Sequence, residues 1–445
     1  MTIKQLVFII ALILTLAAFG WTTRKFAAFF SLTRPGFRVR QIGRRTVLML
    51  KVAFGQTKIF RRPVIGLLHA MVFWGFCVIL IGSIEMVIDG VTGTEKALQF
   101  LGVVYDVIMA SGDVFALIIA VAIIVFLARR IFLHVRRFSG IEMKHISHLD
   151  ANIALIMILL LMVSLLGMNA YYIQQATYTG TPVHGYYPVS MILTGFSRTS
   201  PLAYHVLYEA NWWTHILLIF IFANYLPYSK HFHVFMSVPN VFLSRLEPLG
   251  KLDTMENITR EVKIMMDPDQ AFAAPAEGEE EPEPERFGIL DIEDVSWKGY
   301  LDSLACTECG RCTAACPANI TGKKLSPRKI IMDVRARMKE KGPGLVKQGP
   351  EFSDGRSLVR DLITEEELWA CTLCNACAQE CPININHPAL IVNMRRYLVM
   401  EESAAPGELN AIFSNIENNG APWQFSMEDR MLWAEDITMN DSSGS

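Results

Sequence analysis

The chain has 445 residues, of which 52% are hydrophobic, and its formal net charge is only −2. This balance argues against nucleic-acid binding and against a role for a charged tail. The apolar residues are concentrated in residues 1–233, and the remainder reads as a water-soluble polypeptide.

Five apolar runs are long enough to cross a membrane, which takes about 20 mostly apolar residues. They cover residues 4–22, 64–88, 100–128, 150–170 and 209–229. The first run follows Lys4 and ends in small residues, so a signal peptide is an alternative there. We expect a span, because nothing downstream looks like an exported protein.

The basic residues of the connecting segments predict the orientation. Residues 24–62 carry eleven Lys or Arg and residues 129–144 carry five, whereas the loops facing the other way hold one each, Lys96 and Arg198. Positively charged loops stay in the cytoplasm. We therefore expect a multi-pass inner-membrane protein with its N-terminus outside and everything after residue 230 in the cytoplasm.

Histidines inside a bilayer are candidates for function, although many only form packing hydrogen bonds. His69 lies near the cytoplasmic end of the second span, and His215 and His233 lie 18 residues apart around the fifth. That separation is five helical turns, or about 27 Å, on one side of a helix. His69 and His233 match in depth, as the two axial ligands of one haem b must, and His231 is a competing ligand.

His215 lies near the outer surface and has no such partner, because Ile79 occupies the matching depth of the second span. A second haem there stays open. Asp113 and Glu85, in the third and second spans, are acidic groups on the same side that could exchange protons with a quinone. The alternative is that these carboxylates only make helix contacts.

Beyond the spans, residues 241–270 predict a short amphipathic helix on the inner membrane face. The stretch AFAAPAEGEEEPEPER, residues 271–286, predicts a solvated linker, because it has too little apolar surface to fold.

Eight of the nine cysteines form two runs of the pattern C-x2-C-x2-C-x3-C-P. The first run holds Cys306, Cys309, Cys312 and Cys316, and the second holds Cys371, Cys374, Cys377 and Cys381. Disulfides are disfavoured in the cytoplasm. Structural zinc is the alternative, but it usually takes two distant C-x2-C pairs.

This pattern is typical of ferredoxins with two 4Fe–4S clusters, in which the fourth cysteine of each run ligates the other cluster. We expect Cys306, Cys309, Cys312 and Cys381 to hold one cluster. The second would be held by Cys371, Cys374, Cys377 and Cys316. The stretch between the runs predicts helices at 326–341 and 364–370. The ninth cysteine, Cys77, is expected to pack within a span.

These elements predict an all-α membrane protein, with a five-helix transmembrane bundle and a cytoplasmic α-helical ferredoxin-like domain. The expected limits are 1–240 for the membrane domain, 241–286 for the amphipathic segment and linker, 287–400 for the dicluster domain and 401–445 for a tail that contacts another subunit.

The run HILLIFIFANYLPYSKHFHVFMSVPN, residues 215–240, resembles the last span of the nitrate reductase gamma subunit family of b-type cytochromes. In that family this span and the second span ligate two haems. The chain matches at His69, His215 and His233 and departs at Ile79.

The run SWKGYLDSLACTECGRCTAACPA and the second cysteine run resemble iron–sulfur oxidoreductases similar to heterodisulfide reductase subunits D and E. That group includes electron-transfer-flavoprotein:menaquinone oxidoreductases. The tail NNGAPWQFSMEDRMLW resembles the segment that leads into their CCG domains. The sequence has no adjacent Cys-Cys pair, so we expect those domains on a separate subunit.

The resemblances imply a quinone-linked oxidoreductase subunit, with menaquinone as substrate and a CCG-domain protein or an electron-transfer flavoprotein as partner. The alternatives are a quinol-oxidising anchor for a heterodisulfide- or sulfite-type reductase, and a membrane redox sensor. Electron direction is not readable. No nucleotide-binding loop is recognisable, so hydride chemistry is expected elsewhere.

Overall fold

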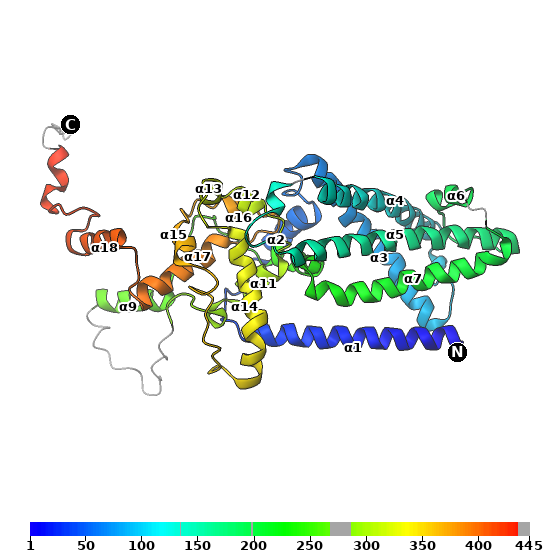
Figure 1. Ribbon diagram of the computed structural model, residues 1–445, viewed down its shortest axis with the longest axis horizontal. Coiled ribbons are helices and arrows are strands. Elements are labelled where there is room, and N and C mark those ends of the chain that lie inside the picture. The colour runs from blue at the N-terminus through cyan, green and yellow to red at the C-terminus, as the bar shows by residue number, and fades with distance from the viewer. Residues whose placement is uncertain (134, 197–198, 268–285, 435–445) are drawn as a thin grey trace, which may run out of the picture.

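The computed structural model describes residues 1–133, 135–196, 199–267 and 286–434 (Figure 1). In these ranges the chain is helical and forms no strand beyond two isolated bridges, Arg34 with Ser296 and Val359 with Ile363. The prediction of a helical protein without a sheet is confirmed for this part of the chain.

Five long helices form a bundle at one end of the molecule (Figure 1). They are α1 (Ile3–Ser31), α3 (Pro63–Thr92), α4 (Val103–Phe132), α5 (His145–Thr179) and α7 (Tyr204–Tyr225). All five are long and apolar enough to cross a membrane, which confirms the five predicted runs. The helices extend beyond those runs because a helix does not end where it leaves the hydrocarbon.

Small residues allow the bundle helices to approach closely. Helix α5 lies between α4 and α7, and α3 packs on α4. A side chain at Gly75 of α3 would collide with Phe115 and Ile119 of α4. Such contacts drive helix association where lipid is as apolar as the side chains.

Shorter elements cover the two ends of the bundle. At one end lie α2 (Ile42–Met49), the π-helix Leu50–Phe54, the 3-10 turn Lys230–Phe232 and α8 (His233–Phe242). At the other end lie the 3-10 turn Gln99–Leu101, α6 (Pro188–Thr194) and the 3-10 turn Pro201–Ala203.

The cysteine-rich part, residues 286–401, is a cluster of short helices around one long helix, α14. Its helices are α11 (Trp297–Ala305), α12 (Arg311–Ala314), α13 (Pro317–Ile320), α14 (Pro327–Gln348), α15 (Glu365–Trp369), α16 (Ala376–Glu380) and α17 (His387–Arg396). The two helices predicted between the cysteine runs are present as α14 and α15. Each starts at a hydroxyl cap, Ser326 and Thr364.

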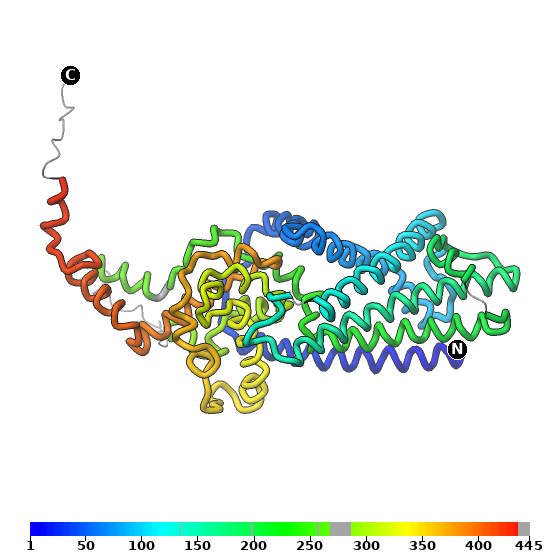
Figure 2. The backbone as a smooth tube through the Cα atoms, turned by 45° about the horizontal axis from the view of Figure 1, so that its top comes forward, coloured from blue at the N-terminus to red at the C-terminus, as the bar shows by residue number. Residues whose placement is uncertain are grey.

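The bundle and the cysteine-rich part share a hydrophobic core. Phe29 near the end of α1 packs with Tyr300 and Leu304 of α11 and Met338 of α14. With 29 residues α1 is about 44 Å long, more than the ~30 Å hydrocarbon core. Its last turns are therefore available to contact the cysteine-rich part (Figure 2).

The segment after α8 does not lie along the membrane end of the molecule as predicted. Its helix α9 (Glu256–Met266) lies beyond the cysteine-rich part, away from the bundle (Figure 1). The preceding chain is held there because Arg396 of α17 donates a 2.6 Å hydrogen bond to the Asp253 carbonyl. Most of the predicted linker, residues 271–285, lies outside the described residues. The described tail continues through α18 (Gly407–Asn419) to the 3-10 turn Glu428–Ala434.

Candidate functional site: two cysteine groups and two histidine positions

The two cysteine loops follow the same backbone course. Glu308 and Gly310 of the first loop have φ of 58° and 72°, and the equivalent Leu373 and Asn375 of the second have 55° and 60°. Left-handed residues allow a tight turn. The fourth cysteines differ: Cys316 directly precedes α13, whereas Cys381 is followed by a turn.

The structure brings the cysteines together in two groups, each made from both runs. The second group lines one cavity and consists of Cys316, Cys371, Cys374 and Cys377. In the first group, Cys309, Cys306 and Cys381 all lie near enough to Cys312 to act on it electrostatically, and so does Cys377 of the second group. These are the two predicted sets, side by side. Their ligation of two clusters stays a prediction.

Burial makes these thiols hard to ionise. It raises the pKa of Cys306 to about 11 and the pKa values of Cys377 and Cys381 to about 12. Buried thiolates need a bound cation to offset the cost of burial. The set of four thiols in each group therefore fits a 4Fe–4S cluster, which is held by four thiolates.

A single zinc ion fits less well. Zinc draws four ligands to one point, with Zn–S distances of about 2.3 Å. Across the described ranges no three Cys, His, Asp or Glu side chains converge in this way.

The first group lies against the bundle. Lys58, just before α3, donates a 3.2 Å hydrogen bond to the Cys381 carbonyl, and Arg311 donates a 3.0 Å bond to the Lys58 carbonyl. A side chain at Gly310 would collide with the carbonyl of Arg137, in the loop between α4 and α5. The second loop tolerates Asn375 at this position. Its cysteine Cys374 is exposed.

The inner histidines lie beside the first group. His69 and His233 are close enough to interact electrostatically, and Arg311 acts on His69 as well. The His69 Nδ1 lies 3.2 Å from the Gln56 Oε1, and the His233 Nδ1 lies 3.4 Å from the Lys230 carbonyl. A haem-ligating histidine commonly engages one ring nitrogen in this way and leaves the other for the iron. The pair therefore fits a haem b.

His231, the competing ligand, lies next to His233, with 5.8 Å between the ring centroids. Its Nδ1 lies 3.1 Å from the Ser229 hydroxyl. The choice between His231 and His233 stays open.

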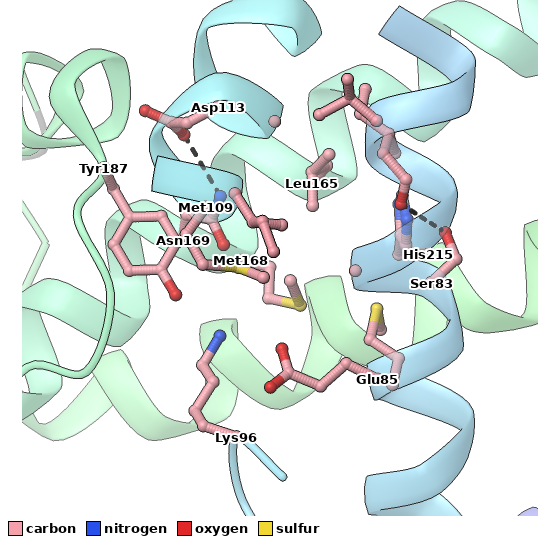
Figure 3. A pocket seen from close by; sticks show the side chains of 16 residues that line it. Ser83, Glu85, Lys96, Met109, Asp113, Leu165, Met168, Asn169, Tyr187 and His215 are labelled. Atoms are coloured by element: carbon pink, nitrogen blue, oxygen red, sulfur yellow. Dashed lines mark hydrogen bonds between the residues drawn. The ribbon is translucent and has the colours of Figure 1, made fainter. Parts of the chain in front are cut away.

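The predicted outer residues His215, Asp113 and Glu85 line one pocket (Figure 3). The His215 Nδ1 lies 3.0 Å from both the Ser164 hydroxyl and the Leu161 carbonyl. Ile79 lines the same pocket, so no second histidine faces His215 from that position.

The two carboxylates of this pocket differ in what holds them. Asp113 accepts hydrogen bonds from the Val189 and Ser190 amides, the Ser190 hydroxyl and Asn169, so it caps the start of α6. Glu85 accepts from the Leu98 amide at 2.9 Å and the Tyr105 hydroxyl at 3.1 Å. For Asp113 the structure therefore favours the alternative given above, a carboxylate that makes helix contacts.

Lys96 is the pocket residue that sequence reasoning missed. Its ammonium lies 4.8 Å from the Tyr172 ring centroid and 5.3 Å from that of Tyr187, and it acts on Glu85 across the pocket (Figure 3). The available signal was that Lys96 is the one Lys or Arg in the loop between the second and third spans, which we used only for topology. A partly buried cation beside a carboxylate is a candidate ligand-binding pair.

Residues 305–385 match the 4Fe-4S dicluster domain family. The chain is 30% identical over 416 residues to the "Probable iron-sulfur-binding oxidoreductase FadF" of Bacillus subtilis, covering 86% of this chain and 54% of FadF. It is 28% identical over 409 residues to the EtfAB:quinone oxidoreductase of Syntrophomonas wolfei, covering 86% of this chain and 53% of that protein.

Over a shorter region of 107 residues the chain is 33% identical to a ferredoxin- and F(420)H(2)-dependent CoB-CoM heterodisulfide reductase subunit of Methanosarcina acetivorans, covering 24% of this chain and 52% of that protein. No solved structure matches the chain. The chain spans about half the length of FadF and of the EtfAB:quinone oxidoreductase. Its homologues are thus iron–sulfur oxidoreductases, while the cytochrome b resemblance of the bundle stays a prediction.

Proposed function

We propose that this chain is a membrane-bound electron-transfer subunit. It passes electrons between a cytoplasmic redox partner and the menaquinone pool through two 4Fe–4S clusters and a haem b. When bound, each of these groups supplies a one-electron redox centre.

The order of the sites along the molecule is the observation that supports this proposal. The second cysteine group has the exposed Cys374, the first group adjoins it through Cys312, and the first group lies against Lys58 and Arg311 beside His69. Redox centres held in a row at these sites would conduct electrons between the aqueous side of the molecule and the membrane.

The inner haem would be held by His69 and His233. Gln56 and the Lys230 carbonyl orient these two imidazoles through their Nδ1 atoms. A second haem at His215 has no facing histidine at Ile79, so we assign the outer pocket to the quinone.

In the outer pocket Lys96 would donate a hydrogen bond to a quinone carbonyl, and Glu85 would exchange the proton. Both side chains point into the pocket (Figure 3), as proton transfer at bond-making distance requires. Asp113 would shape the pocket by holding α6.

The cytoplasmic partner would be a CCG-domain protein or an electron-transfer flavoprotein, and the tail after residue 400 would contact it. The names of FadF and the EtfAB:quinone oxidoreductase support a flavoprotein link. The tail exposes large apolar side chains, among them Trp423 at 66% and Trp433 at 73%. Exposed apolar patches of this kind mark interaction sites.

The orientation follows from the basic segments, with the N-terminus outside and the dicluster domain in the cytoplasm of an inner membrane. Arg61, just before α3, supports this direction, because it donates a hydrogen bond to the Gln379 carbonyl of the cysteine-rich part. We propose that the dicluster domain extends over residues 287–400.

Two alternatives remain in view. A quinol-oxidising anchor of a heterodisulfide- or sulfite-type reductase would use the same sites in the opposite direction, and the match to a heterodisulfide reductase protein favours it. A redox sensor would need the cysteine groups but not the quinone pocket.

Anaerobic optical spectroscopy of the purified holoprotein tests the proposal. A menaquinol analogue is added first and dithionite second. We expect menaquinol to reduce a b-type haem, and His69→Ala to abolish the signal. If dithionite reduces the haem and menaquinol does not, the proposed link to quinone is wrong. If the purified protein shows no haem spectrum at all, the assignment of His69 and His233 as haem ligands is wrong.

A further inference from the structure

The two cysteine loops provide an internal comparison for one residue, Glu308. Its equivalent in the second loop is Leu373, and both have nearly the same left-handed φ, 58° and 55°. This conformation is unfavourable for both side chains. Because a leucine satisfies the loop as well as a glutamate does, the carboxylate of Glu308 is not needed to form the turn.

The Glu308 carboxylate instead joins three parts of the molecule. It is nearly buried, with 7% exposure, and it accepts hydrogen bonds from Arg335 of α14 and from the Ser147 hydroxyl of α5. The Lys230 ammonium lies 3.6 Å from its Oε2. One carboxylate thus connects the first cysteine loop to α14 and to two elements at the inner end of the bundle.

The connection continues in both directions. Arg335 also donates a 3.1 Å hydrogen bond to the Cys306 carbonyl. On the other side, Lys230 donates to the Ser147 hydroxyl at 2.9 Å, and its own carbonyl lies 3.4 Å from the His233 Nδ1. A continuous set of polar contacts therefore runs from Cys306 to His233.

We propose that Glu308 is a positioning residue for electron transfer, which holds the first cysteine loop at a fixed place relative to His233. This inference rests on the proposed function. Glu308 also sets the charge beside the first cluster. Net charge and hydrogen bonding near a cluster set its reduction potential. Without the carboxylate, Lys230 and Arg335 lose the negative charge that they share, and the net positive charge left beside the cluster favours its reduced form.

The test compares Glu308→Leu, which installs the residue of the second loop, with Glu366→Gln. Glu366 is a matched control because it lies near the second run and forms an exposed ion pair with Lys324, both side chains being at least 60% exposed. Potentiometric titration followed by electron paramagnetic resonance measures each cluster. The signals are assigned with Cys309→Ser and Cys374→Ser.

We expect Glu308→Leu to raise the potential of the first cluster alone and to slow haem reduction by the clusters by about tenfold or more, because small displacements of reacting centres are costly. Hydrogen exchange in the first turns of α5, around Ser147, should become faster. Glu366→Gln should change none of these. Unchanged potential, rate and exchange in Glu308→Leu would overturn the proposal.

If Glu308→Leu fails to assemble the first cluster, Lys230→Met tests the same contact without altering the cysteine loop. In Lys230→Met we expect the potential of the first cluster to fall, because a positive charge beside it is removed, while haem reduction slows and exchange at α5 becomes faster as in Glu308→Leu. The absence of all three changes overturns the proposal. If the unmodified holoprotein itself shows no transfer from clusters to haem, the proposed function fails. Hydrogen exchange at α5 then still decides whether Glu308 holds the loop to the bundle.

Discussion

The two ends of the bundle present histidine in different settings. At the end next to the cysteine-rich part, which we propose is the inner end, His69 and His233 come from α3 and α8, interact with each other, and lie beside the first cysteine group. At the outer end, His215 is buried against Ser164 and the Leu161 carbonyl and faces no second histidine from the position of Ile79. The same residue type thus fits a haem ligand at one end and a packing or pocket residue at the other. What surrounds each imidazole decides between these roles.

Replacing each histidine by alanine should have the largest effect and test the difference between the two ends most directly. His69→Ala should remove the b-type haem completely, because an iron loses one of its two axial ligands. His215→Ala should leave the haem in place. The reduced-minus-oxidised spectrum of the purified variants measures both, and loss of haem in His215→Ala alone would reverse the assignment of the two ends.

The outer pocket should control quinol chemistry without affecting the haem. Replacing Lys96 by Gln removes the cation that faces Glu85 (Figure 3). We expect menaquinol-dependent haem reduction to fall by about 10- to 100-fold, because a hydrogen bond from a charged donor contributes about 1.5–3 kcal/mol. Dithionite should still reduce the haem fully. Normal menaquinol kinetics in Lys96→Gln would place the quinone elsewhere.

Asp113 should act on stability and not on chemistry. Asp113→Ala leaves the Val189 and Ser190 amides without their acceptor, at a cost of about 2 kcal/mol. The expected result is a lower unfolding temperature in detergent, with haem reduction per folded protein unchanged. Asp113→Asn keeps one acceptor oxygen and should lose less. A specific loss of quinol activity in the stable Asn variant would contradict this role.

Replacing Gln56, which lies beside His69, should have the smallest effect of these substitutions. Its side chain lies 3.2 Å from the His69 Nδ1 and donates a 2.5 Å bond to the Ala53 carbonyl. Gln56→Leu should weaken haem retention by about tenfold, as loss of an outer partner of a metal ligand does. Haem transfer to apomyoglobin measures this retention. Equal retention in the variant and the wild type would show that Gln56 does not orient His69.

The sequence predicted the parts of this structure that local patterns determine. The five spans follow from apolar length, and the two mixed cysteine groups follow from the spacing of a known motif. The expectation that His215 and His233 lie five turns apart on one helix was wrong, because α7 ends at Tyr225 and His233 starts the separate helix α8 after two 3-10 turns.

The parts that depend on contacts between distant segments could not be predicted. Asp113 became a cap because α6, in another loop, starts beside it. Lys96 reaches the pocket because the chain turns sharply there, with φ of 59°. The place of α9 depends on Arg396, more than a hundred residues later in the chain. None of these contacts between distant segments produces a periodic pattern in the sequence.

The core shared by α1 and the cysteine-rich part has a consequence for biosynthesis. Phe29 belongs to the first helix to leave the ribosome, yet it packs on Tyr300 and Met338, which are translated late. Domains generally fold in the order of synthesis, N-terminal first. Here the aromatic end of the first inserted helix has to wait, uncovered at the membrane surface, until most of the chain has been made. The packing of this helix end is therefore complete only after the cysteine-rich part has folded.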